Sequence, residues 1–415
     1  MRTIACVIGL AGVAAAPCTG SIQVTFDLLV QTGDLVPGTN IPYTGLTRAD
    51  ASNGNFAWRG DAPGATGIYA RVNGTDTIVA QTGMANPAGG FFTDGSFSLA
   101  LGKIDANDFA FRAAGGIYAS FGGSPLQLIA NTSTINPNTG SNYTSFQQPY
   151  ISNGEIAFTN GVSSPQASTT VFSGGTLNAT FNSTSPLPSP MNGSAFLLGN
   201  SVINNGTVGI QVFDSSSVQG ILTNRAGTPN MVATGYQNMP GQTFNFGQFL
   251  DPTIDNDNIA FIAWGPGGTG PGGVGSYRAI YLDDGNTFST IIDTGSPAPQ
   301  GGIFTDFARG PSLFGDTLLF TAGVNGSSAL SGVYAYFGGE TILIADTSMT
   351  FDGKTPASFD LSQQALYATD RGTFFINFTD GSQANYTFHI IPAPGAAALL
   401  ALGAIPAFRR TRNHR

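Results

Sequence analysis

The amino-acid sequence predicts an all-β fold, a single β-propeller of seven four-stranded blades that is closed by its own N-terminal strand. Three observations lead to this prediction. One motif recurs seven times, its spacing averages about 53 residues, and the strand that the seventh unit lacks stands ahead of the first unit. Two smaller β domains are the alternative, because loops of unequal length blur the number of units.

The composition fits short strands joined by many turns. Of the 415 residues, 41% are hydrophobic and 9% are charged, and the chain contains 57 Gly and 24 Pro. A disordered chain has fewer hydrophobic residues, and a helical protein has more Ala, Glu, Lys and Leu. The net charge of −9, without a basic cluster in the body, argues against nucleic acid as a partner, because phosphate binding requires Lys and Arg.

The chain starts with MRTIACVIGLAGVAAAPCTGS, in which a basic Arg2 precedes an apolar run and then small residues. This layout is typical of a secretory signal peptide, so we assign residues 1–20 to one and expect export. A buried first helix is the alternative. The two cysteines, Cys6 and Cys18, lie in or beside this segment, so we expect packing and not disulfides to stabilise the body.

Residues 21–388 contain the repeats of the predicted propeller. The seven copies of the motif read SNGNFAW, ANDFAF, SNGEIAF, NNGTVGI, DNDNIAF, FGDTLLF and DRGTFFI. Asn-Gly, or an Asp or Asn equivalent, supplies the positive φ angles of a tight hairpin turn, and the apolar run after it indicates a buried strand. We therefore expect turns at Asn53, Gly54, Asn107, Asn153, Gly154, Asn205, Gly206, Asn258, Asp316 and Gly372.

A second strand of the GIY type and a third such as DTIVAQTG follow the motif in most units. The seventh unit has no copy of the third strand after Phe375. A matching segment, DLLVQTGDLVPG at residues 27–38, precedes the first motif and has no motif of its own. A ring whose N-terminal strand completes the last blade explains this order, because closure removes exposed strand edges.

The repeats resemble those of bacterial secreted proteins with tandem NxxGxxAF repeats and a variable anchor. The resemblance covers about residues 27–388 and places Gly54, Gly154 and Gly206 in the Gly column. The Asn usually directly precedes this Gly, whereas in the family pattern it stands three residues earlier. That family carries no assigned catalytic residues, so the resemblance implies no catalytic site.

Residues 389–415 contain IPAPGAAALLALGAIPAFRRTR, a short motif followed by an apolar stretch and a basic end. This order resembles a PEP-CTERM sorting signal in which Ala replaces the middle Glu, and the residues concerned are Pro392, Ala393, Pro394, Gly395, Arg409, Arg410 and Arg412. The resemblance implies cleavage by an exosortase-type membrane protease and transfer to the cell surface or extracellular matrix.

The apolar stretch of this tail is long enough to nearly cross a bilayer as a helix, with the arginines on the cytoplasmic side. We therefore expect a hydrophobic sorting helix, a membrane-anchored precursor and only transient contact with the membrane. A permanent anchor and a packed core helix are the alternatives.

The search for chemistry finds few candidate residues. The only histidines, His389 and His414, lie at or inside the tail, which leaves the body without a Ser-His-Asp device or a histidine zinc site. The densest carboxylate group is Asp251, Asp255 and Asp257, which could hold calcium or simply stabilise a turn. Trp264 opens a Gly-Pro loop, where an exposed ring could stack on a sugar.

We therefore expect an exported, non-catalytic surface or matrix protein that is handled by the secretion machinery and an exosortase-type protease. Its expected partners are exopolysaccharide or other envelope components. The alternative is a propeller glycosidase or polysaccharide lyase that uses aspartates of the central channel. Aspartates that converge with an Arg in a deep channel would favour the enzyme, and a channel filled by Phe, Gly and Ala would exclude it.

Overall fold

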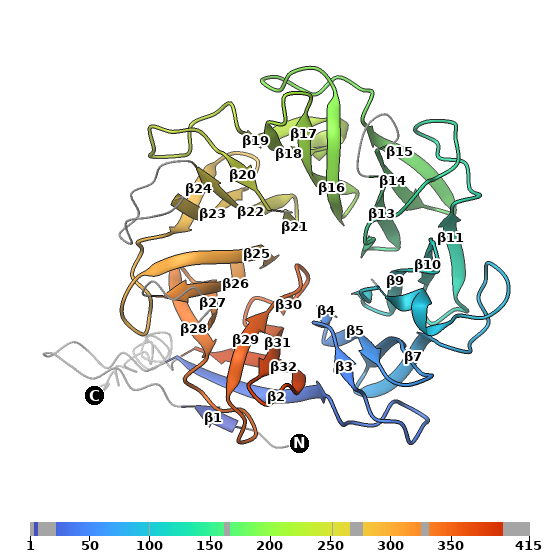
Figure 1. Cartoon of the computed structure of the whole chain (residues 1–415). Coiled ribbons are helices and arrows are strands. Elements are labelled where there is room, and N and C mark those ends of the chain that lie inside the picture. The colour runs from blue at the N-terminus through green and yellow to red at the C-terminus, as the bar shows by residue number, and fades with distance from the viewer. Residues whose placement is uncertain are drawn as a thin grey trace, which may run out of the picture.

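The structure, a computed structural model, describes residues 4–6, 22–98, 100–161, 167–250, 252–265, 277–324 and 332–392. Seven antiparallel sheets stand as blades around a central axis, and the chain builds them in sequence order around the ring (Figure 1). The all-β class and the seven-bladed propeller are thereby confirmed. The tail from residue 393 onward, with the expected sorting helix, lies outside the described residues.

The blades share one plan, in which the innermost strand leads through a tight turn into the strand that carries the repeated motif. In the first three blades, from the axis outward, the strands are β4 (Asp50–Ser52), β5 (Asn55–Asp61), β6 (Gly67–Val72) and β7 (Thr75–Gln81); β8 (Lys103–Asp105), β9 (Asp108–Ala113), β10 (Gly116–Ser120) and β11 (Gln127–Asn131); and β12 (Tyr150–Ser152), β13 (Glu155–Asn160), β14 (Ser168–Ser173) and β15 (Thr176–Asn182).

In the next three blades the strands are β16 (Ala195–Asn204), β17 (Thr207–Asp214), β18 (Gln219–Thr223) and β19 (Asn230–Thr234); β21 (Thr253–Asp255), β22 (Asn258–Gly265), β23 (Tyr277–Asp283) and β24 (Phe288–Asp293); and β25 (Phe304–Phe314), β26 (Thr317–Val324), β27 (Gly332–Phe337) and β28 (Glu340–Asp346). Two short strands, β3 (Gly45–Leu46) and β20 (Gln248–Phe249), add to β5 and β22.

The seventh blade joins the two ends of the described chain. It contains β29 (Pro356–Asp360), β30 (Leu366–Ala368), β31 (Arg371–Phe378), β32 (Gln383–Ile391) and β2 (Gln23–Gln31). Strand β2 pairs antiparallel with β32 along its whole length, from Gln23 opposite Ile391 to Gln31 opposite Ala384. The predicted closure by an N-terminal strand is therefore confirmed.

The register of β2 shows that it is a true outer strand. In blade one, the β6–β7 pairing shifts between Ile68 and Tyr69, so Val79 has no partner in the ladder. The same shift occurs in blade seven, where Leu29 of β2 is left without a partner in β32. On the outer side of β2 lies β1 (Ile4–Cys6), formed by residues that we assigned to the signal peptide.

The repeated turns lie where the sequence predicts them in five of the seven blades. Asn53 and Gly54 have φ angles of 50° and 75°, and the Asn153–Gly154 and Asn205–Gly206 turns repeat this geometry. Asn107 and Asp316 occupy the second position of their turns.

Two of the expected turn residues are wrong, because Asn258 and Gly372 lie inside β22 and β31. The turns are formed instead by Asn256–Asp257 and Thr369–Asp370. Neither of these dipeptides contains the Asn-Gly pair that forms the turn in blades one, three and four, so no such pair marks the position of the turn.

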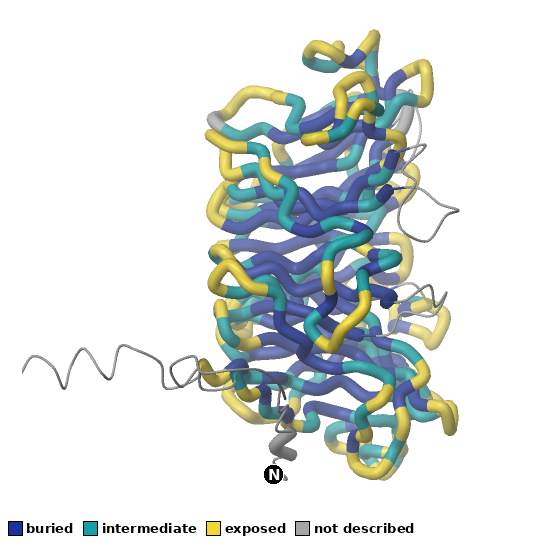
Figure 2. Tube along the Cα trace, turned by 90° about the vertical axis from the view of Figure 1, so that its left-hand side faces the viewer, coloured by how far each residue is buried: buried dark blue, intermediate teal, exposed yellow. Residues whose placement is uncertain are grey.

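Aromatic pairs explain why the motif ends in an aromatic residue and the next strand carries a Tyr. Phe111 and Tyr118 are directly opposite in β9 and β10, and their rings stack with centroids 5.7 Å apart. The same cross-strand pairing joins Phe261 to Tyr281, Phe320 to Tyr334 and Phe374 to Tyr386. Buried residues accordingly follow the strands through the disc, and exposed residues concentrate in the loops (Figure 2).

The last strand extends beyond the domain boundary that the sequence suggested. Strand β32 continues through His389 to Ile391, three residues past the expected end at 388. His389, which we had placed in the tail, pairs with Asp370 at 3.0 Å. No helix among the described residues is long and apolar enough to cross a bilayer.

Candidate functional site at the channel mouth

The central channel is divided by a short segment of blade seven. Residues 361–365 interrupt the innermost strand between β29 and β30 and reach toward the middle of the ring (Figure 1). Gln363 forms two hydrogen bonds with blade five. Its side-chain amide donates one to the Pro252 carbonyl at 2.8 Å, and its backbone carbonyl accepts one from the Thr253 hydroxyl at 3.1 Å. The Gln364 carbonyl accepts a bond of 2.8 Å from the Ala51 backbone N–H.

Cavities lie on both sides of this segment, and we name the one at the start of the innermost strands the channel mouth. It has a volume of about 240 Å³, and Gln363 lines both cavities. The polar residues that line the channel mouth are Arg48, Lys103, Gln148, Tyr150, Asn200, Arg309 and Gln363. Three cations from three different blades thus meet in one cavity.

Lys103 forms the buried part of this site. Its ammonium group lies 2.9 Å from Asp50 of the preceding blade, and its side chain is only 2% exposed. The ammonium also lies 4.0 Å from the centre of the Tyr150 ring in the following blade. Ser362 donates a hydrogen bond to Asp50, and the Tyr150 hydroxyl donates one to Gln363.

The protonation of this pair reflects its burial. Burial raises the pKa of Asp50, and the Lys103 charge opposes that change. Burial likewise lowers the pKa of Lys103, opposed by the Asp50 charge. Through Tyr150 and Ser362, the pair links blades one, two and three to residues 361–365, which we call the plug segment.

Two arginines form the outer part of the channel mouth. Arg48 and Arg309 both pair with Asp360 of blade seven, at 3.1 Å and 2.8 Å, from the two blades that flank it. Arg309 is 58% exposed and has a φ of 57°, where the pairing of β25 with β26 is irregular. A non-glycine residue in this conformation is uncommon and is often found at functional positions.

The second cavity, of about 150 Å³, lies at the opposite end of the innermost strands and is lined by their last residues. Its polar groups connect neighbouring blades. Asp105 accepts a bond of 2.5 Å from the Asn153 backbone N–H, and Asp255 accepts one of 2.7 Å from the Gly315 N–H. Burial raises the pKa of Asp255. These carboxylates act as links between blades.

The predicted calcium ligands are only partly described. Asp251 lies outside the described residues, Asp255 forms the blade contact above, and Asp257 accepts a hydrogen bond from Thr207. Among the described residues, no three side chains of the metal-ligating types gather in one place. Calcium binding stays a prediction.

Trp264 does not open a loop, because it is the seventh residue of the eight-residue strand β22. Its half-buried ring packs against the core, and the guanidinium of Arg278 lies 5.0 Å from the ring centre. An intramolecular cation therefore covers the face that we expected to meet a sugar. Of the sorting motif, Pro392 is the last described residue, and Ala393, Pro394, Gly395 and the arginines lie outside the description.

Sequence reasoning missed Arg48, Lys103 and Arg309. A signal was present, since Asp50, Lys103 and Tyr150 stand three residues before the start of their turns, where blades four to six have Val202, Thr253 and Ser312. A lysine in an innermost strand is conspicuous in a chain with 15 lysines and arginines in total.

Comparison with known proteins identifies a family. A sequence model of a family of unknown function, DUF7453, matches residues 19–313. No curated protein matches the sequence.

Several solved structures are similar to this chain at low identity. The propeller domain of the trilobed protease from Pyrococcus furiosus is 10% identical over 83% of this chain and 95% of its own, with a TM-score of 0.45. Trypanosoma rangeli sialidase is 10% identical over 85% of this chain and 55% of its own (TM-score 0.35), and a Mycobacterium tuberculosis puromycin-hydrolyzing peptidase is 11% identical over 85% and 62% (TM-score 0.36). These likenesses concern the fold alone.

Proposed function

The chain belongs to DUF7453, a family of unknown function, and from its own residues we propose that it is an exported surface protein whose channel mouth binds an acidic polysaccharide without cleaving it. The observation that carries the proposal is the meeting of Arg48, Lys103 and Arg309 in one cavity. The structure describes ten lysines and arginines, so this cavity collects about a third of them.

The chemistry of the cavity fits a carboxylate on a sugar. The exposed guanidinium of Arg309 has the fork geometry that carboxylates accept, and Asp360 leaves part of its five donors free. Gln148 and Asn200 add amide groups to the lining of the cavity. Lys103 acts as a positioning residue, because it is buried and bound to Asp50.

The net charge of the whole protein restricts the class of acidic polymer that can bind. Acidic residues outnumber lysines and arginines by 24 to 15, so the overall field repels dense polyanions. A local basic cavity in such a body favours a polymer with spaced carboxylates, such as a uronic acid polysaccharide, over nucleic acid.

The two terminal segments support the proposed location. The N-terminal layout predicts export, and the C-terminal motif resembles a sorting signal for an exosortase-type protease. The described propeller closes without residues 393–415, because β2 supplies the outer strand of the last blade. A tail that the ring does not need can be removed without loss of the fold, which delivers the propeller to the cell surface or matrix.

A glycosidase or polysaccharide lyase is the second candidate, and one observation favours it. Asp50 and Asp360 lie with Arg48 and Arg309 at the channel mouth, which is the arrangement that the sequence analysis named as favouring an enzyme. Both carboxylates are, however, held by cations: Asp50 by Lys103, and Asp360 by two arginines. Because these cations occupy the carboxylate oxygens, neither group is placed to take a proton from a substrate.

Isothermal titration of the full chain with oligogalacturonate and with neutral cello-oligosaccharide tests the proposal. We expect binding of the acidic oligomer alone, loss of at least tenfold in affinity for Arg309→Gln, and weaker binding at higher salt. Arg371→Gln is the matched control, because Arg371 is an exposed arginine that pairs with the adjacent Asp370 in blade seven. Equal affinity of wild type and Arg309→Gln would refute the site, and release of unsaturated products or new reducing ends would establish the enzyme.

A further inference from the structure

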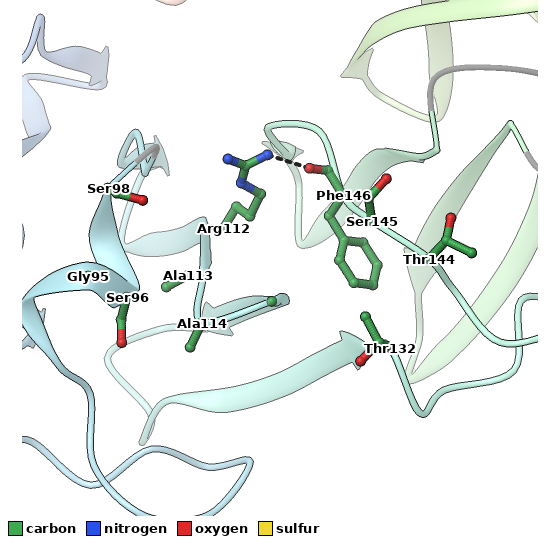
Figure 3. Close-up of a pocket in the computed structure, with 11 residues that line it drawn as sticks. Gly95, Ser96, Ser98, Arg112, Ala113, Ala114, Thr132, Thr144, Ser145 and Phe146 are labelled. Carbon is green, nitrogen blue, oxygen red and sulfur yellow. Dashed lines mark hydrogen bonds between the residues drawn. The ribbon is translucent and has the colours of Figure 1, made fainter.

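A separate groove lies between blades two and three, next to the channel mouth. Its volume is about 320 Å³, and its polar lining consists of Ser96, Ser98, Arg112, Thr132, Thr144 and Ser145 (Figure 3). None of the residues that line it is acidic. The groove therefore offers one cation and several hydroxyl groups.

Arg112 stands apart from the other cations that the structure describes. Each of the other nine lysines and arginines that the structure describes has a carboxylate within 4 Å, and Arg112 has none among the described residues. Its guanidinium donates one hydrogen bond, of 2.5 Å, to the backbone carbonyl of Phe146 (Figure 3). In a chain with 24 acidic residues, an arginine without an acidic partner is an exception.

Because Arg112 is half-buried, its lack of an acidic partner costs free energy. Burial lowers the pKa of Arg112, which shows that its charge is partly removed from water without a compensating anion. A guanidinium has five N–H donors, and the Phe146 carbonyl uses one of them. A carboxylate from outside the protein can take two of the remaining donors in a bidentate pair.

The surroundings of Arg112 suit a sugar ring. The hydroxyl groups of Ser98 and Ser145 lie on either side of the guanidinium in Figure 3, where they can exchange hydrogen bonds with sugar hydroxyls.

The same two chain segments line the groove and the channel mouth. Ser98 lines the groove and Leu101 lines the channel mouth, while Phe146 lines the groove and Gln148 lines the channel mouth. A hydrogen bond of 3.3 Å from the Leu101 N–H to the Gln148 side chain joins the two segments between the cavities. The groove thus lies alongside the channel mouth, and a linear polymer can occupy both.

We infer that this groove is a second subsite, in which Arg112 binds the carboxylate of another acidic sugar of the chain held at the channel mouth. The inference rests on the proposed function for its choice of polymer, while the groove itself stands on the missing partner of Arg112. Two linked subsites strengthen binding of a long chain through effective concentration, without strengthening binding of a monosaccharide.

Titration of the full chain with galacturonate oligomers of increasing length tests this inference. For the wild type we expect affinity to rise steeply once the oligomer spans both cavities. Arg112→Gln should remove that rise, a loss of about tenfold or more for long oligomers, and leave the affinity of the shortest bound oligomer unchanged. Arg309→Gln should weaken all lengths.

Ser98→Glu is a second variant that leaves Arg112 and its bond to Phe146 in place. Ser98 is exposed and lines the groove, so the new carboxylate supplies Arg112 with an internal partner and should also remove the gain with length. Thermal melting of both variants checks the fold. If both variants melt like the wild type and bind long oligomers as tightly, the inference is overturned while the channel site stands. If Arg112→Gln loses binding and Arg309→Gln does not, the channel proposal fails and the groove remains as an independent site.

Discussion

Replacing Lys103 by Met tests how the channel is held together. Methionine is similar to lysine in length and carries no charge, so the change leaves Asp50 as a buried carboxylate without its counter-ion. The Lys103 ammonium lies 2.9 Å from Asp50, and both side chains are at most 3% exposed. Ser362 remains as the neutral hydrogen-bond partner of Asp50.

The expected loss follows from the burial of the pair. Removing one partner of a buried ion pair costs about 3–5 kcal/mol, whereas an exposed pair contributes less than about 1 kcal/mol. With an unfolding entropy of about 2.1 cal/mol/K per residue and about 370 residues, the loss corresponds to a fall of about 4–6 °C in melting temperature. The double variant Asp50→Leu with Lys103→Met removes both charges and should recover most of this loss.

The pH dependence of the Lys103→Met variant has a definite sign. Burial raises the pKa of Asp50, and loss of the Lys103 charge raises that pKa further. A carboxyl group whose pKa is higher in the folded state binds more protons folded than unfolded, so the free energy of unfolding increases as the pH falls through the folded pKa. The deficit of the variant against wild type is therefore largest at neutral pH and shrinks toward the unfolded pKa of about 4.

Scanning calorimetry between neutral and mildly acidic pH measures this effect. Arg71→Gln is the control, because the Arg71–Asp76 pair lies in an exposed hairpin and should change the melting temperature by less than about 1 °C. A Lys103→Met variant that melts like the wild type at neutral pH, or whose deficit grows on acidification, would refute the reasoning.

Three further predictions concern the ring and the tail. A chain that starts after Gln31 lacks β2 and exposes the edge of β32, so gel filtration should show aggregates in place of a monomer; a monomeric product would contradict the closure. Gly67→Ala places a methyl group about 2.2 Å from the Ala80 carbonyl oxygen, so urea unfolding should show a free energy of unfolding lower by roughly 1–3 kcal/mol. An unchanged unfolding midpoint would show that β6 and β7 can move apart without cost. Mass spectrometry of native protein should find a C-terminus near Pro394, and an intact Arg415 in the membrane fraction would exclude removal of the tail.

The propeller could be predicted because the same sequence motif recurs in its blades. Each blade has a tight turn after its innermost strand, and five of the seven place an aromatic residue opposite a Tyr of the next strand, so weak copies of the motif reinforce one another. The closing strand was found by the same logic, since DLLVQTG repeats the outer-strand pattern of blade one. The turns at Asn256–Asp257 and Thr369–Asp370 lack an Asn-Gly pair and were misplaced, although the Ala106–Asn107 turn, which also lacks glycine, was found.

The binding site could not be predicted in the same way, because it depends on departures from the repeat. Arg48 and Arg309 are distant in the sequence and meet only because the ring closes, and both then pair with Asp360 of the last blade. Blades one and five also break their innermost strands, between β3 and β4 and between β20 and β21, but the break in blade seven, at residues 361–365, is longer. Its sequence, LSQQA, contains no charge or motif that indicates a contact with blades one, three and five.

The plug segment also limits how a polymer can bind. Gln363 is fastened to blade five by two hydrogen bonds and accepts one from Tyr150 of blade three, so residues 361–365 separate the channel mouth from the cavity behind them. A glycan chain therefore cannot thread through the ring, and it must enter and leave the channel mouth by the same face. The groove that holds Arg112 lies beside that mouth and provides such an exit. A closed channel with an adjoining groove is thus better suited to hold an acidic chain at the surface than to pass it through the protein.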